Sequence, residues 1–280
     1  MELGICSYSF HRLLAAGKQD IFRYITDCRE LGCTQLDPWN AHLAPLKAGD
    51  DVLTAGANPN RSHELLTTAA DDEYVEQVEE AADVSGLPWG TLVVDGAHIY
   101  EPSPEQRQAN RQKAYRWIDI AGKLGFEQIR IDAGGPEAMP DDVFGVIVEG
   151  YNDLIARAKP LGVQVLIENH WGPSVVPDNV SKLCESIDGL GLLLDTHNWK
   201  PELRDQGRRQ CAKYAAACHI KTFEWDAGGN ETSGSKPAEA IQILLDAGYK
   251  GVWGIESVPK DGDEYAGARR TIALIRRYVS

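Results

Sequence analysis

Short apolar runs alternate with helical segments eight times along the chain, and this alternation limits the fold more than any other feature of the sequence. Each run is rich in aliphatic residues and is bounded by glycine, proline or polar residues, as buried parallel strands usually are. We expect strands at residues 3–10, 33–39, 88–96, 127–134, 163–168, 190–196, 219–223 and 251–257. Strict alternation predicts a parallel sheet, and eight units predict closure into a (β/α)8 TIM barrel, with residues 1–280 as a single domain.

The helices between these runs are marked at both ends. Ser103 is a favourable N-cap, Pro104 follows at the first helical position, and Gln106 completes a capping pattern. Gly125 then ends this helix, because glycine readily adopts the left-handed conformation of a helix end. Similar signals predict helices at residues 21–31, 72–85, 104–124, 140–159, 177–187, 205–216, 237–246 and 263–279. The first strand is not followed by a GxGxxG motif, so a dinucleotide-binding open sheet is disfavoured.

The charge of the chain argues against binding to nucleic acid. The formal net charge is −14, whereas binding to a phosphate backbone requires a basic surface. The six cysteines form no CxxC pair, which fits reduced thiols in the cytoplasm. The chain starts without a basic leader and has no run of roughly 18 apolar residues. We therefore expect a cytoplasmic protein without a nucleic-acid or membrane partner, and the sequence leaves assembly into a homo-oligomer open.

Four potential metal ligands lie on the last four expected strands: Glu168, Asp195, His219 and Glu256. In a TIM barrel the carboxyl ends of all strands meet at one mouth, so these side chains are expected to converge. Three carboxylates at short range in a poorly solvated site repel one another and cannot all stay ionised without a cation. We therefore predict a divalent metal site, with Mn²⁺ favoured and Mg²⁺, Co²⁺ or Zn²⁺ as alternatives.

Aromatic and polar residues at the same strand ends predict a small carbohydrate or polyol as the substrate. Indole faces at a wet barrel mouth can cover the C–H face of a sugar. Four tryptophans lie at or just beyond strand ends: Trp39, Trp171, Trp199 and Trp225. The predicted substrate contacts are Trp39, His98, His170, Trp171, His197, Asn198 and Lys221. For the histidines, hydrogen bonding behind the site is the alternative, and for Lys221 it is an ion pair with a strand-end carboxylate.

The four strand ends also carry a family resemblance. Their motifs are Glu168-Asn169-His170, Asp195-Thr196-His197-Asn198, His219-Ile220-Lys221 and Ile255-Glu256-Ser257. With these motifs, essentially the whole chain resembles the sugar phosphate isomerase/epimerase family of xylose isomerase-like barrels. The resemblance implies that Glu168 and Glu256 both bind the metal and act as an acid/base pair, with Asp195 and His219 as the other ligands. Asn198 departs from the pattern, because ketose epimerases of this group typically carry a histidine at that position.

The sequence supports one leading function and two alternatives. The leading hypothesis is a metal-dependent sugar isomerase or epimerase, in which a carboxylate removes a proton next to a carbonyl and the metal stabilises the enediolate. The first alternative is a lyase on a keto-sugar or keto-inositol, such as a dehydratase or C-glycoside deglycosidase, with His98, His170 or His197 assisting the leaving group. The second is a sugar-binding subunit without catalysis. We expect loops at residues 40–71 and 227–234 to decide substrate choice, and His42 in the first loop to be solvated.

Overall fold

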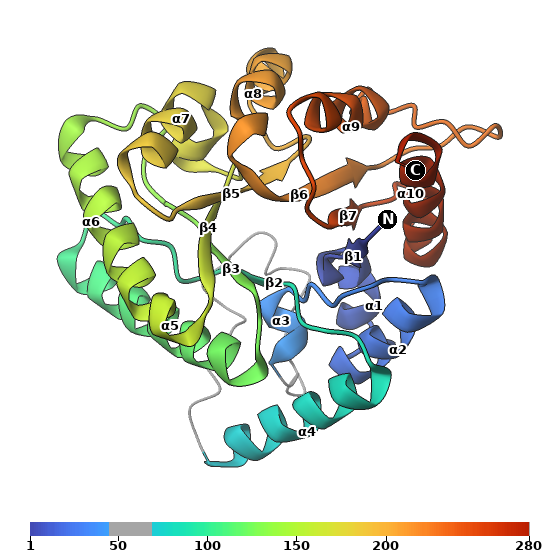
Figure 1. Cartoon of the computed structure of the whole chain (residues 1–280), viewed down its shortest axis with the longest axis horizontal. Helices are drawn as coiled ribbons and strands as arrows, with labels where there is room; N and C mark the ends of the chain where they lie inside the picture. The colour runs from blue at the N-terminus through green and yellow to red at the C-terminus, as the bar shows by residue number, and fades with distance from the viewer. Residues whose placement is uncertain (45–68, 280) are drawn as a thin grey trace.

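A curled parallel sheet forms the centre of the molecule. The computed structural model describes residues 1–44 and 69–279, and within these ranges the sheet has seven strands in the order β1-β7-β6-β5-β4-β3-β2. The strands are β1 (Leu3–Ile5), β2 (Thr91–Val94), β3 (Gln128–Ile131), β4 (Gln164–Glu168), β5 (Gly191–Asp195), β6 (Ala215–Thr222) and β7 (Trp253–Ser257). Every neighbouring pair is parallel, and Figure 1 shows the strands around a central axis with helices outside them.

An irregular segment closes the barrel between β1 and β2. Residues 33–39, expected as the second strand, instead contribute three isolated bridges: Cys6 with Asp37, Leu36 with Trp89, and Trp39 with Val93. Backbone hydrogen bonds from Ser7 N to Asp37 O (3.1 Å) and from Val93 N to Pro38 O (2.9 Å) join the segment to both edges of the sheet. Pro38 has no N–H to donate, which works against a regular ladder here. The predicted TIM barrel is therefore confirmed, with an irregular segment at the place of the second expected strand.

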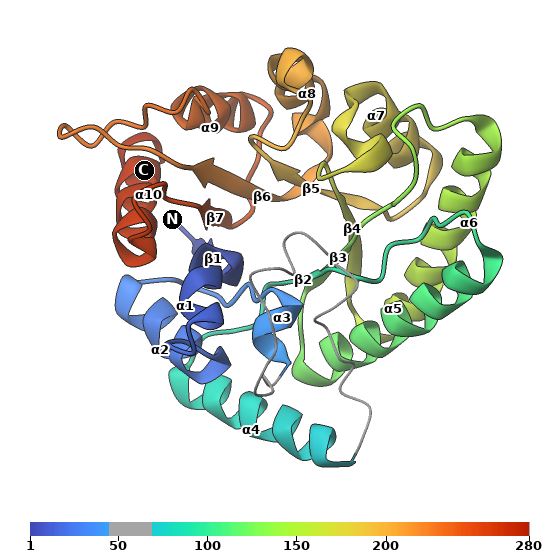
Figure 2. The same ribbon diagram turned by 180° about the vertical axis from the view of Figure 1, so that it is seen from behind.

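Helices follow the strands and surround the sheet, as the two opposite views show (Figures 1 and 2). They are α1 (His11–Ala15), α2 (Ile21–Leu31), α3 (Asn40–Leu43), α4 (Ala69–Ser85), α5 (Pro104–Leu124), α6 (Asp141–Ala158), α7 (Pro177–Ser186), α8 (Arg204–Cys211), α9 (Pro237–Asp246) and α10 (Glu264–Tyr278). The predicted start of α5 is confirmed, because the Ser103 side chain accepts a hydrogen bond from Gln106 N (3.2 Å). Gly125 ends α5 at φ 79°. Within the described ranges, none of these helices is long and apolar enough to cross a membrane.

The first and seventh expected strands differ from the observed ones at their ends. The first strand ends at Ile5, because residues 7–10 turn into a short 3-10 helix. The seventh was expected to begin at His219, but β6 already begins at Ala215, and the preceding helix α8 ends at Cys211. Alanine favours a helix in isolation, but here Ala215 pairs with Leu192 of β5, and this tertiary contact outweighs the local preference. His219 therefore lies within a strand instead of opening one.

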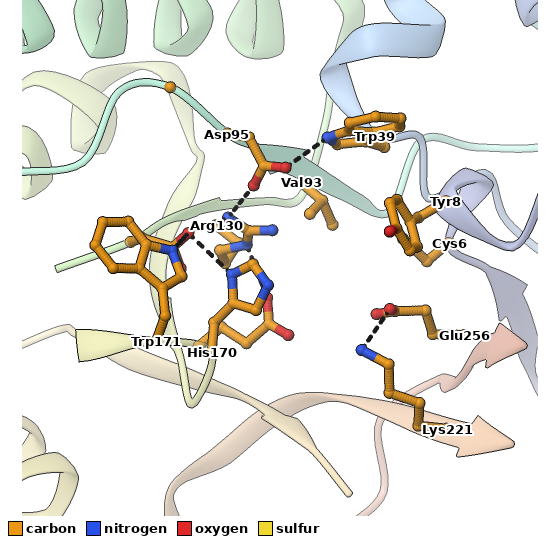
Figure 3. Close-up of a pocket in the computed structure, with 13 residues that line it drawn as sticks. Cys6, Tyr8, Trp39, Val93, Asp95, Arg130, His170, Trp171, Lys221 and Glu256 are labelled. Atoms are coloured by element: carbon orange, nitrogen blue, oxygen red, sulfur yellow. Dashed lines mark hydrogen bonds and ion pairs between the residues drawn. The ribbon is translucent and has the colours of Figure 1, made fainter. Parts of the chain in front are cut away.

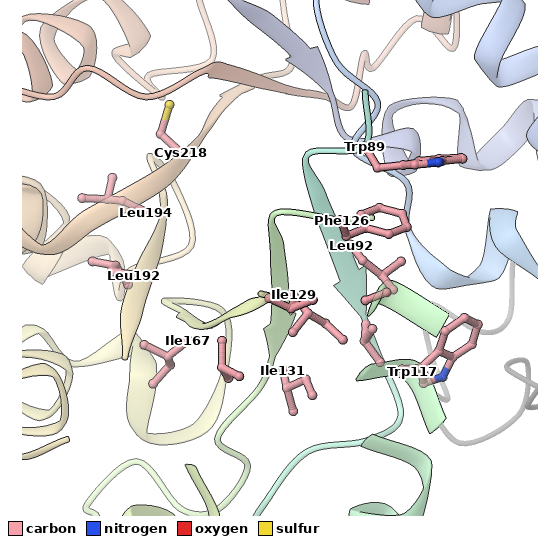
Figure 4. Packing of buried hydrophobic residues seen from close by; sticks show 14 of the residues in the cluster. Trp89, Leu92, Trp117, Phe126, Ile129, Ile131, Ile167, Leu192, Leu194 and Cys218 are labelled. Carbon is pink, nitrogen blue, oxygen red and sulfur yellow. The ribbon is translucent and has the colours of Figure 1, made fainter. Parts of the chain in front are cut away.

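Alternation along the strands divides the buried side chains into two layers. Leu92 and Ile167 belong to the larger hydrophobic cluster, which lies between the sheet and the surrounding helices (Figure 4). Their neighbours Val93 and Leu166 belong to a smaller buried cluster with Trp39, inside the barrel. Strand residues that share the direction of Val93 and Leu166 therefore point toward the barrel axis.

His42 is buried, so the solvated position expected from the sequence is wrong. It lies in α3 with a relative exposure of 1%, and its Nε2 is 3.1 Å from Gln19 Oε1. The short helix folds the imidazole against the rings of Tyr24 and Trp39. Burial lowers the pKa of His42 to about 3. The expected influence of this loop on substrate choice concerns mainly residues 45–68, which lie outside the described residues.

Asp37 is a buried carboxyl group in the segment that closes the barrel. Its Oδ1 accepts hydrogen bonds from Gln35 Nε2 (2.7 Å) and Thr91 N (2.8 Å). A Cβ atom added at Gly4 would lie 1.8 Å from Asp37 Oδ2, so the glycine leaves the space that the carboxyl group occupies. Burial raises the pKa of Asp37 to about 6, because the charged form loses hydration.

We predict that Asp37→Asn stabilises the protein at neutral pH. The carboxyl group binds its proton more tightly in the folded state, at a pKa of about 6, than in the unfolded state, at about 4. Its favourable contribution is therefore present below pH 4 and is lost as the pH rises through 6. Urea unfolding should show a variant whose free energy of unfolding exceeds that of the wild type by about 1–3 kcal/mol at pH 8, and by less at pH 4. A difference that does not change with pH, or one shared by the exposed control Asp246→Asn, contradicts this.

Candidate active site

The four residues predicted to bind a metal meet at one end of the barrel. Glu168 and Asp195 are the last residues of β4 and β5, and Glu256 is the penultimate residue of β7. His219 lies opposite Asp195 in the pairing of β5 with β6. Because β4, β5, β6 and β7 are successive neighbours in the sheet, their ends bring the four side chains together. All four are buried, and their possible ligand atoms lie within 4.8 Å of one another.

This cluster fits a divalent metal ion. His219 Nδ1 is 2.9 Å from Glu256 Oε2 and 3.9 Å from Glu168 Oε1. Despite these short separations, Nδ1 makes no well-directed hydrogen bond, and Asp195 Oδ2 also has no hydrogen-bond partner in the described part of the chain. Buried polar atoms without partners are costly, and a cation between them would satisfy both. Carboxylate oxygens with one imidazole suit Mn²⁺, Mg²⁺, Co²⁺ or Zn²⁺.

The two glutamates have pKa values displaced in opposite directions. Burial raises the pKa of Glu168, and the nearby charge of Arg130 opposes this rise only in part. Burial also acts to raise the pKa of Glu256, but Lys221 and His219 outweigh it and hold that pKa well below its usual range. Different neighbours therefore make Glu256 the more strongly ionised carboxyl group of the two.

Lys221 is in direct contact with two residues of the four-residue cluster. Its Nζ is 2.7 Å from Glu256 Oε1 and 3.5 Å from Asp195 Oδ2. The same ammonium group donates a hydrogen bond to Asn198 Oδ1 (3.0 Å), while Asn198 Nδ2 lies 3.3 Å from Glu168 Oε1. Of the two roles considered from the sequence, the ion pair with a strand-end carboxylate is the one present in this structure. The side chain also borders the pocket described next, so contact with a substrate stays a prediction.

A pocket of about 350 Å³ opens beside the cluster, within the size range of small-molecule sites. Of the residues predicted to contact metal or substrate, the pocket is lined by Trp39, Glu168, His170, Trp171, Lys221 and Glu256. Figure 3 shows Glu256 and Lys221 on one side, with His170 and Trp171 across from them. The sequence thus identified residues on both sides of one pocket.

His98 and His197 do not line this pocket. His98 Nε2 pairs with Glu101, and its ring packs edge-on against Trp171 with centroids 5.0 Å apart, so it lies behind the indole. His197 Nε2 is 3.3 Å from Arg204 Nη2, and its ring packs against Phe223. Burial, followed by the charge of Arg204, lowers the pKa of His197 to about 4. Both rings are therefore held by neighbours at the edge of the site.

Three charged residues of the pocket were not identified from the sequence: Asp95, Arg130 and Asp132. Arg130 and Asp132 lie at and just beyond the end of β3, and Asp95 follows β2. Arg130 pairs with Val93 on one side and with Leu166 on the other, and thus points into the barrel as they do. The available signal was the period of two in Ile129-Arg130-Ile131-Asp132, which places both polar side chains on one face.

Fold and cluster together define a class of protein, a TIM barrel with a candidate divalent-metal site at the carboxyl ends of its strands. Residues 52–278 match the family model described as the xylose isomerase-like TIM barrel, and the chain belongs to this family. The resemblance found in the sequence motifs is confirmed at this level. No curated protein gives a significant match to the chain.

Solved structures share the fold at low sequence identity. The chain is similar to the IolI protein with a bound zinc atom, at 13% identity and a TM-score of 0.72, with 100% of both chains covered. It is also similar to D-psicose 3-epimerase with D-tagatose from Clostridium cellulolyticum H10, at 14% identity and a TM-score of 0.68, with 100% of both chains covered. A probable 3-DHS dehydratase from Bacillus anthracis is similar at 12% identity and a TM-score of 0.66, with 99% of each chain covered. The TM-scores establish a common fold.

We predict that Lys221→Met increases the affinity of the cluster for Mn²⁺. The lysine ammonium group contacts two of the candidate ligand carboxylates and competes electrostatically with a second cation at the same place. Its removal should lower the Kd for Mn²⁺ at least about 10-fold, as measured by calorimetry, because close charges interact by more than 1.4 kcal/mol at a partly screened site. The metal-free variant should also melt at a lower temperature, since two buried carboxylates lose their counter-charge.

Lys260→Met is the matched control for this experiment. Lys260 is also paired with a glutamate, Glu224 (2.9 Å), but its side chain is 61% exposed. Its loss should leave the Mn²⁺ affinity and the melting temperature nearly unchanged. If Lys221→Met binds Mn²⁺ no more tightly than this control, the lysine does not oppose metal binding.

Proposed function

We propose that the protein is a divalent-metal-dependent isomerase or epimerase of a sugar or sugar derivative. The observation that carries this proposal is the meeting of two buried glutamates, Glu168 and Glu256, at the wall of one small pocket. Both also belong to the cluster that fits a metal ion, together with Asp195 and His219. Acid/base groups and a metal site are thus within reach of the same bound molecule.

The proposed reaction begins with the loss of a proton from the carbon next to a carbonyl group. A bound divalent cation, with Mn²⁺ as the expected ion, would polarise the carbonyl and stabilise developing negative charge. Glu256, whose pKa is held low, starts as the carboxylate that accepts the proton on a side-chain oxygen, while the C–H electron pair moves toward the carbonyl. Return of a proton from Glu168 to the opposite face gives an epimer. Return to the former carbonyl carbon gives an isomer, provided that the proton of the neighbouring hydroxyl group moves to the former carbonyl oxygen.

Trp39, Trp171 and Lys221 are the proposed substrate contacts that line the pocket. The indoles offer flat apolar surfaces to sugar C–H groups, and Lys221 offers a cation to a sugar oxygen. Support for a carbohydrate substrate also comes from the structural neighbour whose structure holds D-tagatose. His98, His197 and Asn198 are expected to position these groups: the ring of His98 packs against Trp171, and the backbone N–H groups of His197 and Asn198 donate to Asp195 Oδ1. A cytoplasmic location remains part of the proposal.

A lyase is the second candidate, and the placement of His170 favours it. His170 lines the pocket, its side chain is 33% exposed, and its Nδ1 lies 3.1 Å from Asp132 Oδ2. In the described part of the chain, no side chain or backbone group forms a hydrogen bond with its Nε2. After proton abstraction, cleavage of a β C–O bond would release a hydroxyl group that takes a proton from this imidazole and leaves as water. The dehydratase among the structural neighbours is consistent with such chemistry on this fold.

We predict that Glu256→Gln abolishes proton exchange while the metal stays bound. Protein loaded with Mn²⁺ is incubated with keto-sugars in D2O, beginning with D-fructose and D-tagatose, and deuterium next to the carbonyl is followed by NMR. The wild type should incorporate deuterium, and the variant should do so about 10²–10⁴-fold more slowly, because the amide cannot accept the proton. Metal analysis reports whether Mn²⁺ is retained. Undiminished exchange by the metal-loaded variant contradicts the assigned role.

The same experiment separates the two reactions. Labelled epimer or isomer without loss of water supports the leading proposal, whereas an unsaturated product supports the lyase. In the second case His170→Asn should suppress elimination more strongly than deuterium exchange, because it removes only the acid. Glu224→Gln is the matched control for Glu256→Gln, since Glu224 is outside the cluster and is paired with Lys260.

A further inference from the structure

Two tryptophans of the pocket are joined through one arginine. Trp39 Nε1 donates a hydrogen bond to Asp95 Oδ2 (2.8 Å), and Asp95 Oδ1 accepts one from Arg130 Nη1 (2.9 Å). The same Nη1 donates to Asp132 Oδ2 (2.8 Å), which also accepts from Trp171 Nε1 (3.0 Å). A continuous chain of hydrogen bonds thus fixes both indoles relative to the guanidinium group. Figure 3 shows Arg130 between Asp95 and His170, with Trp39 and Trp171 to either side.

One terminal nitrogen of the guanidinium group, Nη2, has neither a hydrogen bond nor an ion pair within the described residues. Nη1 is used by the two aspartates and by Val94 O (2.9 Å), and Nε is 2.9 Å from Glu168 Oε2. For Nη2, no acceptor is found among residues 1–44 and 69–279, whereas Nε is the guanidinium nitrogen that is fully buried without a directed hydrogen bond. Arg130 also lines the pocket. Nη2 thus has two N–H donors that no group in the described part of the chain accepts, and they are available to a molecule bound in the pocket.

The charges around Arg130 point to an uncharged oxygen as that partner. Asp95 and Asp132 together carry two negative charges, and Arg130 itself supplies one positive charge. A third carboxylate, that of Glu168, lies 2.9 Å from Arg130 Nε. Three carboxylates around one guanidinium group would repel a further anion. A sugar hydroxyl or carbonyl group meets the need for an acceptor without adding negative charge.

We propose that Arg130 binds the substrate through Nη2, at oxygens on the side of the pocket away from Lys221 and Glu256. Asp95 and Asp132 are positioning residues that hold the guanidinium group between the two indoles. The inference rests on the proposed function and adds to it: the bound molecule has an uncharged oxygen, besides those at the metal site, that Arg130 binds next to Glu168. Arg130 then decides which sugars bind, whereas the metal cluster decides what happens to them.

The test is sugar binding by Mn²⁺-loaded protein, with D-fructose and D-tagatose as probes and tryptophan fluorescence as the signal. Arg130→Gln should raise the Kd for the bound sugar about 10- to 100-fold, the usual effect of losing a hydrogen bond from a charged donor. The Kd for Mn²⁺, measured separately by calorimetry, should not rise, because Arg130 Nε lies 2.9 Å from Glu168 Oε2 and its positive charge opposes a cation there. Arg157→Gln is the matched control, because Arg157 is also paired with an aspartate (Asp119, 2.7 Å) but is 48% exposed on α6.

Arg130→Lys distinguishes substrate contact from a purely structural role. Lysine restores the charge between Asp95 and Asp132 but not the second guanidinium nitrogen. If Nη2 contacts the substrate, Arg130→Lys should have normal Mn²⁺ affinity and a normal melting temperature but weak sugar binding. Recovery of sugar binding in this variant would overturn the proposal. Equal sugar binding by wild type and Arg130→Gln refutes this inference alone. If Arg130→Gln loses both Mn²⁺ and sugar binding, Arg130 acts through Glu168, and this outcome also refutes the inference. If the wild type binds neither sugar, both this inference and the proposed carbohydrate substrate are contradicted.

Discussion

The burial of three carboxylates at neighbouring strand ends is the constraint on which the rest of the site depends. Glu168, Asp195 and Glu256 are 2%, 0% and 6% exposed, and like charges at such range destabilise one another. The chain supplies cations on both sides: Lys221 contacts Glu256 and Asp195, and Arg130 Nε approaches Glu168. Arg130 is also paired with Asp95 and Asp132, so its charge does not serve Glu168 alone. A divalent ion would satisfy the buried atoms that lack partners.

One irregularity in the sheet determines which residues of β6 face the cluster. Leu192 pairs with Ala215 but Leu193 pairs with Ala217, so one residue of β6 is passed over. A shift of one residue exchanges the two faces of a strand. Beyond this point His219 lies opposite Asp195, and Lys221 lies opposite Glu256. Without the extra residue, the side chains at the end of β6 would be directed toward the helices instead of the barrel axis.

The sequence predicted that the four candidate ligands meet at the strand ends, because charged residues interrupt apolar runs there. Glu168 and Glu256 are charged residues at the ends of aliphatic strands, and a parallel barrel must bring such ends together. It did not identify Arg130 and Asp132, because alternation of isoleucine with charged residues also describes a strand with one solvated face. Which face they occupy depends on the closed barrel and on pairing with Val93 and Leu166, which are non-local contacts.

Other differences have the same origin. His42 follows proline and tryptophan in a region of weak periodicity, where nothing local indicates that a short helix will fold it against Tyr24. The early start of β6 could not be predicted either. Ala215 to Ala217 favour a helix by local preference, and only their pairing with β5 makes them part of a strand. Local signals therefore gave the order of the elements and most of their caps, whereas tertiary pairing determined their ends and the direction of inward polar side chains.

Asp132 connects substrate orientation with the choice of reaction. Its Oδ2 accepts hydrogen bonds from Arg130 and Trp171 and lies 3.1 Å from His170 Nδ1. A guanidinium group, an indole and an imidazole are thereby held around a single oxygen atom, so none can move without disturbing the others. Under the proposed function, a sugar held by Arg130 would consequently have a fixed position relative to the imidazole. A sugar that places an oxygen of the β carbon at His170 would undergo elimination after proton loss. A sugar that places only distant hydroxyl groups there would instead be reprotonated by Glu168.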